Sequence, residues 1–249
     1  MAPTLIESYR KDLSEWPHTG DTRSVRFGFL LASKSLFKIS EHEIIEPEDD
    51  VVRYVLIERV GANIPDVELS NMILDYEDDG LNEQDIIQEL LRSGVVDEAN
   101  NVTAGRVGLR NYSFVEDGQD IDCFQVAGAY IQPTSHRKGI MSRTYVFMLN
   151  WYEHLVCDDM QTIPGARIWA GPMIRAGEVR IYNENGGSFE DVLGEKGIGR
   201  HNGFLPWNRG RLFDTSQWAP NQLQTTVQKF IVLIISQGTC VRIGFIPEP

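Results

Sequence analysis

The chain of 249 residues has few cysteines, no long apolar run and little basic charge, and each shortage excludes a class of protein. Cys123, Cys157 and Cys240 are widely spaced and form no C-x-x-C pair, which excludes zinc ribbons and thioredoxin-type redox motifs. The longest apolar run, residues 230–235, is far shorter than the ~20 residues that a membrane-spanning helix needs. The odd number of cysteines and the polar, amphipathic start of the chain predict a protein that is not secreted and binds no membrane.

Catalytic and metal-binding motifs are also lacking. No G-x-S-x-G or H-E-x-x-H is present, and the three glycines of residues 194–199 do not follow the dinucleotide-binding order. Residues 75–80 begin like a calcium loop, but Ile86 stands where a bidentate glutamate is required. His154 and Cys157 would share a helix face, yet the acids that follow would raise the thiol pKa, which favours a buried structural cysteine. We therefore expect no enzyme, no catalytic residue, no metal and no cofactor.

The charge of the chain is divided unevenly. Residues 1–100 hold 22 Asp or Glu against 9 Lys or Arg, whereas residues 101–249 hold 14 of each, so the net charge of −13 lies in the first part. This balance argues against nucleic acid as the main partner, because binding to phosphates needs a basic surface. A small cationic cluster follows later, at Arg200, His201, Arg209 and Arg211. The acidic and cationic sections could attract each other between copies or pair within one molecule, or the acids could serve solubility alone.

The first residues predict a helix over 4–16. Thr4 and Glu7 form a capping box, and Pro17 ends the run. Its apolar face could lie on the body of its own chain or form an arm that contacts a neighbouring copy. The residues of that face recur at helical spacing, and they are Leu5, Tyr9, Leu13 and Trp16.

The rest of the pattern predicts a β-rich protein. Helices are expected after Pro65 and from the N-cap Asn82 to Gly94, which together make an acidic helical insertion over 62–94. Residues 41–50 form a charged connector, and residues 144–151 could be a buried strand or a helix. The expected fold is one α+β domain over 1–249, an antiparallel β-sandwich with an N-terminal helix. The expected strands are two within 25–39 joined at 33–35, then 51–60, 109–115, 123–131, 167–170, 178–182, 230–235 and 239–246.

Residues 201–211, within a long ordered loop expected over 186–218, are the most distinctive surface-type segment. Arg200, Trp207, Arg209 and Arg211 belong to residue types that anchor protein interfaces. The segment could be an interface loop, a lid over a ligand pocket, or a packed loop. We include these four residues, with the apolar face of 4–16, in a candidate self-association interface.

The capped helix 4–16, the β-rich body with helical insertions and the length of the chain resemble the polyhedrins of cypoviruses, with a further likeness at residues 181–187. The resemblance implies a compact β-sandwich whose N-terminal helix contacts neighbouring copies. It implies a structural protein that forms protective crystals around virus particles in the cytoplasm of infected cells. A bound nucleotide is implied by the resemblance alone.

Under this interpretation the protein is its own main partner. Contacts that point symmetry does not close propagate without limit, which is what a lattice protein needs. Buried networks of carboxylates, tyrosines and arginines would loosen in alkali, because tyrosines would ionise beside existing acids. Two alternatives remain: an accessory protein that clamps a viral capsid, and an enzyme whose active-site loop lies in 186–218.

Overall fold

The computed structural model describes residues 21–136, 138–158, 160–207, 224–226, 228 and 230–240. In this part of the chain nine strands form one sheet in the order β1-β2-β3-β4-β5-β6-β11-β8-β9. Neighbouring strands are antiparallel except β5 and β6, which are parallel and are connected through helix α3. The strands of this sheet are β1 Thr22–Ala32, β2 Ser35–Ile44, β3 Val51–Arg59, β4 Val102–Glu116, β5 Gln119–Ile131, β6 His154–Val156, β8 Val179–Asn183, β9 Ser188–Val192 and β11 Ile231–Ser236.

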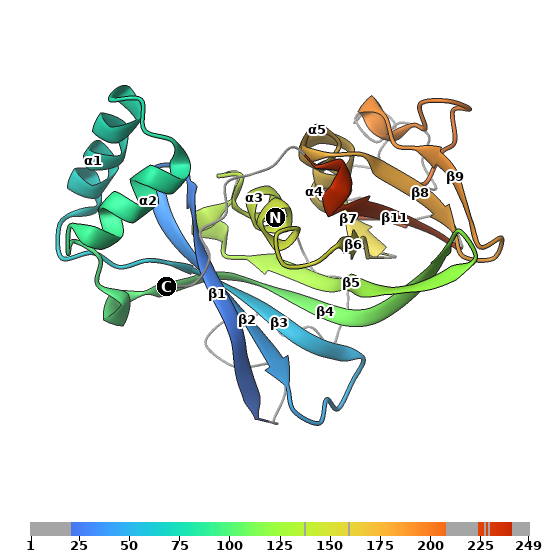
Figure 1. Ribbon diagram of the computed structural model, residues 1–249, viewed down its shortest axis with the longest axis horizontal. Coiled ribbons are helices and arrows are strands. Elements are labelled where there is room, and N and C mark those ends of the chain that lie inside the picture. Colours follow the sequence, from blue (N-terminus) through green and yellow to red (C-terminus); the bar gives the residue numbers. More distant parts are fainter. Residues whose placement is uncertain are drawn as a thin grey trace.

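Helices occupy two places beside the sheet (Figure 1). One group lies between β3 and β4 in the sequence, and the other lies against the inner face of the bent sheet. A short ribbon of β7 Met160–Thr162 and β10 Gln224–Thr226 accompanies the second group. The helices are α1 Asp66–Asp78, α2 Glu83–Arg92, α3 Ile140–Met148, α4 Ile163–Ile168, a π-helical turn Trp169–Met173 and α5 Ile174–Ala176.

The main core lies between the sheet and the second group of helices. Leu30 of β1 and Ile181 of β8 belong to the same buried cluster, although these strands lie near opposite ends of the sheet. Phe147 of α3 and Trp169 of the π-helical turn fill the space between them. The sheet therefore bends around these helices, and β4 and β5 run beneath them along the molecule (Figure 1).

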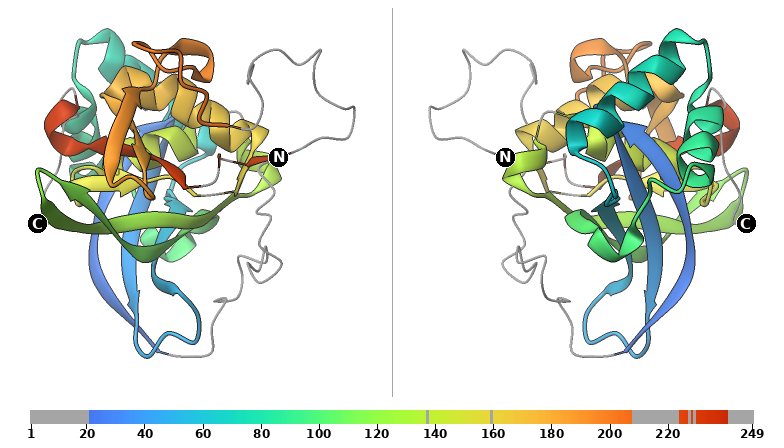
Figure 2. Two further views of the ribbon diagram at one scale, coloured as in Figure 1. Left: turned by 90° about the vertical axis from the view of Figure 1, so that its right-hand side faces the viewer. Right: turned by 90° about the vertical axis from the view of Figure 1, so that its left-hand side faces the viewer.

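The strands β1 and β2 are buried on both faces. Leu30 and Phe37 face the main core, whereas Phe29, Leu31 and Leu36 belong to a second cluster beneath α1 and α2. A strand covered on both sides needs apolar residues in succession, which accounts for the run from Phe29 onward. The two helices thus pack on β1 and β2 on the face opposite the main core (Figure 2, right).

The β-rich α+β class is confirmed, but the antiparallel β-sandwich is not. Nine of the described strands form one large sheet, and helices occupy the inner face where a second large sheet would lie. Residues 144–151, which the sequence left open as a buried strand or a helix, contribute to this difference from a sandwich, because the first of them belong to helix α3. The strand expected at 167–170 is also wrong. Thr162 Oγ1 accepts a hydrogen bond of 3.0 Å from Gly165 N and starts helix α4 there.

Most of the other expected elements are confirmed. The β1–β2 hairpin, β3, both helices of the insertion, the β4–β5 hairpin and β8 lie where the pattern predicted them. The charged connector begins later than expected, because β2 continues to Ile44. The helix 4–16 lies outside the described residues, as does all but the beginning of the segment 239–246. No helix in the described part of the chain is long and apolar enough to cross a bilayer.

Candidate functional site

The helices α1 and α2 form a two-helix unit on the edge of the sheet, over residues 62–94. The side chain of Asn82 accepts a hydrogen bond of 3.1 Å from Asp85 N and caps α2, and Gly94 after its end has a φ of +72°. Ile73 of α1 and Ile86 of α2 are almost fully buried against β1 and β2. Apolar burial therefore fixes the unit to the body, and its polar side chains lie at the boundary or in solvent.

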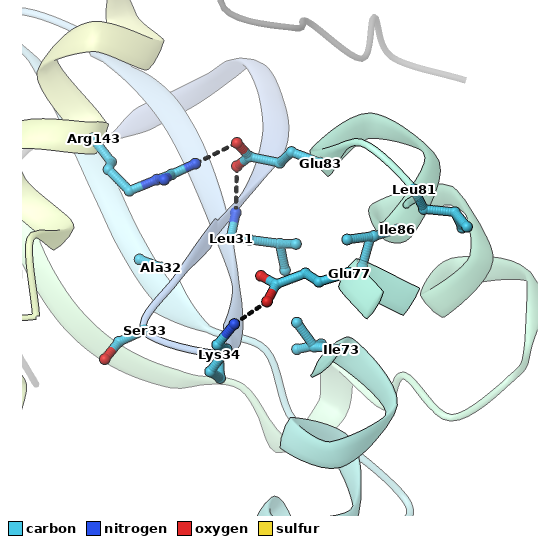
Figure 3. Close-up of a pocket in the computed structure, with 10 residues that line it drawn as sticks. All are labelled: Leu31, Ala32, Ser33, Lys34, Ile73, Glu77, Leu81, Glu83, Ile86 and Arg143. Carbon is cyan, nitrogen blue, oxygen red and sulfur yellow. Dashed lines mark hydrogen bonds and ion pairs between the residues drawn. The ribbon is translucent and has the colours of Figure 1, made fainter. Parts of the chain in front are cut away.

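A pocket of about 340 Å³ lies where this unit meets the body (Figure 3). Apolar side chains from both helices and from β1 form one part of its lining, and four charged side chains form another. The size is at the lower end of the range for small-molecule sites. The lining residues are Leu31, Ala32, Ser33, Lys34, Ile73, Glu77, Leu81, Glu83, Ile86 and Arg143.

Two ion pairs cross the pocket from the body to the helices. Lys34, in the β1–β2 turn, pairs with Glu77 of α1, and Arg143 of α3 pairs with Glu83 of α2 (Figure 3). The carboxylate of Glu83 also accepts a hydrogen bond of 2.8 Å from Leu31 N. Because β1 is an edge strand, this bond satisfies an amide that has no neighbouring strand. The cations thus come from the body and the carboxylates from the helical unit.

The turn beside the pocket has an uncommon backbone. Ser33 and Lys34 both have positive φ, +51° and +59°, at the centre of a two-residue hairpin. Such turns usually contain Asn or Gly, and other residues pay about 1–2 kcal/mol each for the left-handed conformation. Ser70 Oγ of α1 donates a 3.2 Å hydrogen bond to Lys34 O and holds the turn in place. Strain of this kind occurs where a side chain must be presented in a fixed position.

The outer face of α1 is acidic with two exposed apolar side chains. Val67 and Leu74 are 70% and 39% exposed and lie on one face, since two helical turns separate them. The last turn of α1 contains Asp75 and Asp78 and no basic residue. Carboxylates at a helix C-terminus face the negative end of the helix dipole, which costs about 0.3–1 kcal/mol each. This arrangement is unfavourable for the helix itself.

In the described part of the acidic section, residues 21–100, the Lys and Arg side chains pair with carboxylates of the section itself. Each of the seven Lys or Arg within residues 21–100 forms an ion pair with a carboxylate of the same range. Among the described residues, no ion pair involves Glu68, Asp75, Asp78 or Asp79. The two-helix unit holds nine Asp or Glu and one Arg, and it therefore presents an excess of negative charge. The seven cations are Arg23, Arg26, Lys34, Lys38, Arg53, Arg59 and Arg92.

The candidate interface residues lie in different environments. Arg200 is exposed in the loop after β9. Strand β9 lies at the end of the molecule opposite the two-helix unit (Figure 1). Trp207 is 1% exposed and packs in the main core, so its ring offers no contact area at the surface, contrary to its place in our interface. The loop is a packed loop at this residue. The remaining candidates, Leu5, Tyr9, Leu13, Trp16, Arg209 and Arg211, lie outside the described residues.

A buried carboxylate organises the loop that carries Arg200. Asp191 of β9 is 7% exposed and accepts hydrogen bonds of 3.0 Å each from the backbone amides of His201 and Asn202. Burial alone would raise the pKa of Asp191, but the backbone hydrogen bonds outweigh it and lower the pKa. A Cβ at Gly199 would lie 2.1 Å from this carboxylate, so only glycine fits there. The glycines of 194–199 thus serve loop geometry.

The structure also brings together a serine and a histidine that the sequence did not indicate. His154 Nδ1 lies 2.8 Å from Ser236 Oγ, across the paired strands β6 and β11. Arg180 donates a 3.2 Å hydrogen bond to the same oxygen and forms an ion pair with Glu116 at the tip of the β4–β5 hairpin. His154 and Ser236 are only 8% and 7% exposed. We interpret this network as a structural one that holds the tip of the β4–β5 hairpin against the outer face of β6, β11 and β8.

The cysteines are not arranged for catalysis. Cys157 is fully buried after β6, and its sulfur accepts a hydrogen bond from Leu233 N, so a shared helix face with His154 does not exist. Burial raises the pKa of Cys123 to about 12, with a further contribution from Asp122, and burial also raises the pKa of Cys240. Within the described ranges no group of His, Cys, Asp and Glu has the arrangement of a metal site.

Comparisons of the chain with protein-family models, with curated proteins and with solved structures find no match.

Proposed function

We propose that this protein is a structural protein whose function is to associate with copies of itself. The observation that carries the proposal is the outer face of α1, where Val67 and Leu74 are exposed among carboxylates. Asp75 and Asp78, in the last turn, weaken the helix that carries them, so a benefit outside the folded chain must offset their cost. Exposed apolar side chains rimmed by charge are the pattern of a protein interaction site.

The chain itself contains a segment of opposite charge. Residues 195–211 hold four Lys or Arg and one acid. Arg200 of this segment is exposed and follows β9, which lies at the far end of the molecule from the two-helix unit (Figure 1). A contact between these two ends of neighbouring copies joins unlike surfaces, and such a head-to-tail contact repeats without closing. This repetition supports an extended assembly over a closed dimer.

The resemblance to polyhedrins extends this proposal. Under it the assembly is a crystalline body that encloses virus particles in the cytoplasm of an infected cell. The expected N-terminal helix contact of 4–16 would add apolar area to the polar contact described above. The chemistry of the protein would then be binding alone, without catalysis.

The test measures the mass of the full chain in solution as a function of protein and salt concentration, by analytical ultracentrifugation. We expect the average mass to rise with protein concentration and to fall with salt, because salt screens the charged contact. The variant Asp75→Lys/Asp79→Lys should abolish association, and its helix should remain folded because lysines suit a helix C-terminus. The matched control is Glu46→Lys/Glu48→Lys, with the same charge change in the exposed loop between β2 and β3.

Two results would contradict the proposal. If the Asp75→Lys/Asp79→Lys variant still associates, α1 is not part of the interface. A monomer at every concentration would remove self-association and favour the alternative of an accessory protein that clamps a different capsid protein.

A further inference from the structure

The pocket between the two-helix unit and the body has balanced charge, and this balance limits what it can bind. Two cations, Lys34 and Arg143, face two carboxylates, Glu77 and Glu83, across an apolar lining that includes Ile73. A ligand with net charge would add a charge without a partner. A ligand with no charges would displace water from four charged groups without offering them a charge or a hydrogen bond in its place.

We propose that this pocket binds a small zwitterion with an apolar body, of the size of a free aliphatic or aromatic amino acid. The ammonium of such a ligand would contact the carboxylates from the helices, and its carboxylate would contact the cations from the body. Its apolar part would lie against Leu31, Ile73 and Ile86. The volume of about 340 Å³ suits a ligand of this size, and it is too small for most larger cofactors.

The charged groups are held in place before a ligand enters. Leu31 N fixes one oxygen of Glu83, and Ser70 fixes the turn that carries Lys34. The positive φ of Ser33 and Lys34 is the backbone conformation that a two-residue hairpin requires, and this turn places the lysine at the rim of the pocket. A preformed site loses less side-chain freedom on binding than a mobile one. The geometry therefore favours recognition over a simple surface ion pair.

The experiment is a titration of the full chain with defined probes, followed by calorimetry and by NMR shifts of the pocket amides. The zwitterions are leucine and phenylalanine. Isoamylamine and isocaproate each keep the apolar body of leucine and lack one charge, whereas glycine keeps both charges and lacks the body. We expect binding of leucine or phenylalanine, with shifts at Leu31, and dissociation constants about fivefold to tenfold higher for each incomplete probe.

Variants decide whether the pocket is responsible. Glu77→Gln and Arg143→Gln should each weaken binding about fivefold to tenfold. Glu89→Gln is the matched control, because Glu89 forms an ion pair with Arg92 on α2 and does not line the pocket. Circular dichroism and thermal unfolding show whether each variant remains folded. A variant that does not fold is replaced by Lys34→Gln, which tests the opposite side of the same ion pair.

Three outcomes would overturn the proposal. They are the absence of binding of both zwitterions at millimolar concentration, equal affinity for the singly charged probes, and unchanged affinity in the pocket variants. The self-association measured above has a different readout, so either proposal can fail while the other stands.

Discussion

The buried carboxylate of Glu41 is the most demanding test of the electrostatics of this fold. Glu41 lies in β2 with no exposed surface, and it accepts hydrogen bonds from Arg26 of β1 and Arg53 of β3. The two guanidinium groups also stack on aromatic rings, 5.0 Å from the centroid of Trp151 and 4.7 Å from that of Phe124. Replacing the carboxylate removes one charge and leaves two cations beside each other.

We expect Glu41→Gln to lower the free energy of unfolding by about 2–4 kcal/mol. Breaking a fully buried ion pair costs about 3–5 kcal/mol, and the cost here is smaller because water reaches the arginines. The side chains of Arg26 and Arg53 are 29% and 24% exposed. The measurement is urea-induced unfolding, in which the midpoint should fall while the slope stays constant.

The control is Glu43→Gln on the same strand. Glu43 pairs with Arg23, whose side chain is 70% exposed, and it lies 4.0 Å from Arg53, so its loss should cost less than about 1 kcal/mol. If the two variants unfold at the same urea concentration, the idea that burial makes Glu41 important is wrong.

Two further predictions concern pH. Because the pKa of Asp191 is lowered in the fold, its stabilising effect is complete above the ordinary aspartate range and is lost as the pH falls through the lowered pKa. In amide exchange corrected for intrinsic rates, the protection of the His201 and Asn202 amides should decrease when the pH is lowered below about 4. Asp191→Asn should remove this protection at every pH. Protection that does not depend on pH in the native chain would contradict the prediction. The pKa of Tyr112 is raised above the ordinary 10.0, first by burial and then by its hydrogen bond to Glu184. The unfolded chain therefore loses this proton at a lower pH than the folded chain, and unfolding becomes easier as the pH rises above 10. Tyr112→Phe should lose about 0.5–1.5 kcal/mol at neutral pH and show a weaker alkaline loss by urea unfolding, and an unchanged alkaline loss would exclude Tyr112 as its source.

Local signals predicted the local elements well. Helix α2 could be predicted because Asn82 caps its first turn and Gly94 ends it, and both residues do so in the structure. The β1–β2 and β4–β5 hairpins followed from alternation and turn residues. Thr162 and Pro164 also signal a helix start, but the prediction of a strand at 167–170 did not use that signal.

The arrangement of these elements depended on contacts that the sequence does not display. Strand β6 has three residues, and it belongs to the sheet through its parallel pairing with β5 and its antiparallel pairing with β11. Residues 41–44 resembled a connector because they contain acids, yet Glu41 is buried since two arginines from neighbouring strands neutralise it. The fold class could be predicted from pattern, and the single bent sheet could not.

The candidate site was harder still to predict. Its four charged side chains come from the β1–β2 turn, α1, α2 and α3, and the register of each element decides which of them meet. Glu77 and Glu83 form ion pairs with the body, whereas Asp75 and Asp79, two residues from Glu77 on either side, remain on the outer face. In the sequence, all of these carboxylates look alike.

The ion pairs also bear on the three roles considered for the acidic section. Residues 21–100 contain nineteen Asp or Glu and seven Lys or Arg, and all seven cations are paired within this range. Ion pairs inside the molecule therefore use the section's own cations together with Arg110 and Arg143, and they leave most of the excess negative charge. Arg200 follows β9, which is the edge strand at the opposite end of the sheet from β1. Like charges held together on one helix repel, so counterions or a second molecule must balance them. If a second copy balances them, the strength of association must fall steeply with salt, whereas acids that serve solubility alone give a mass that salt does not change.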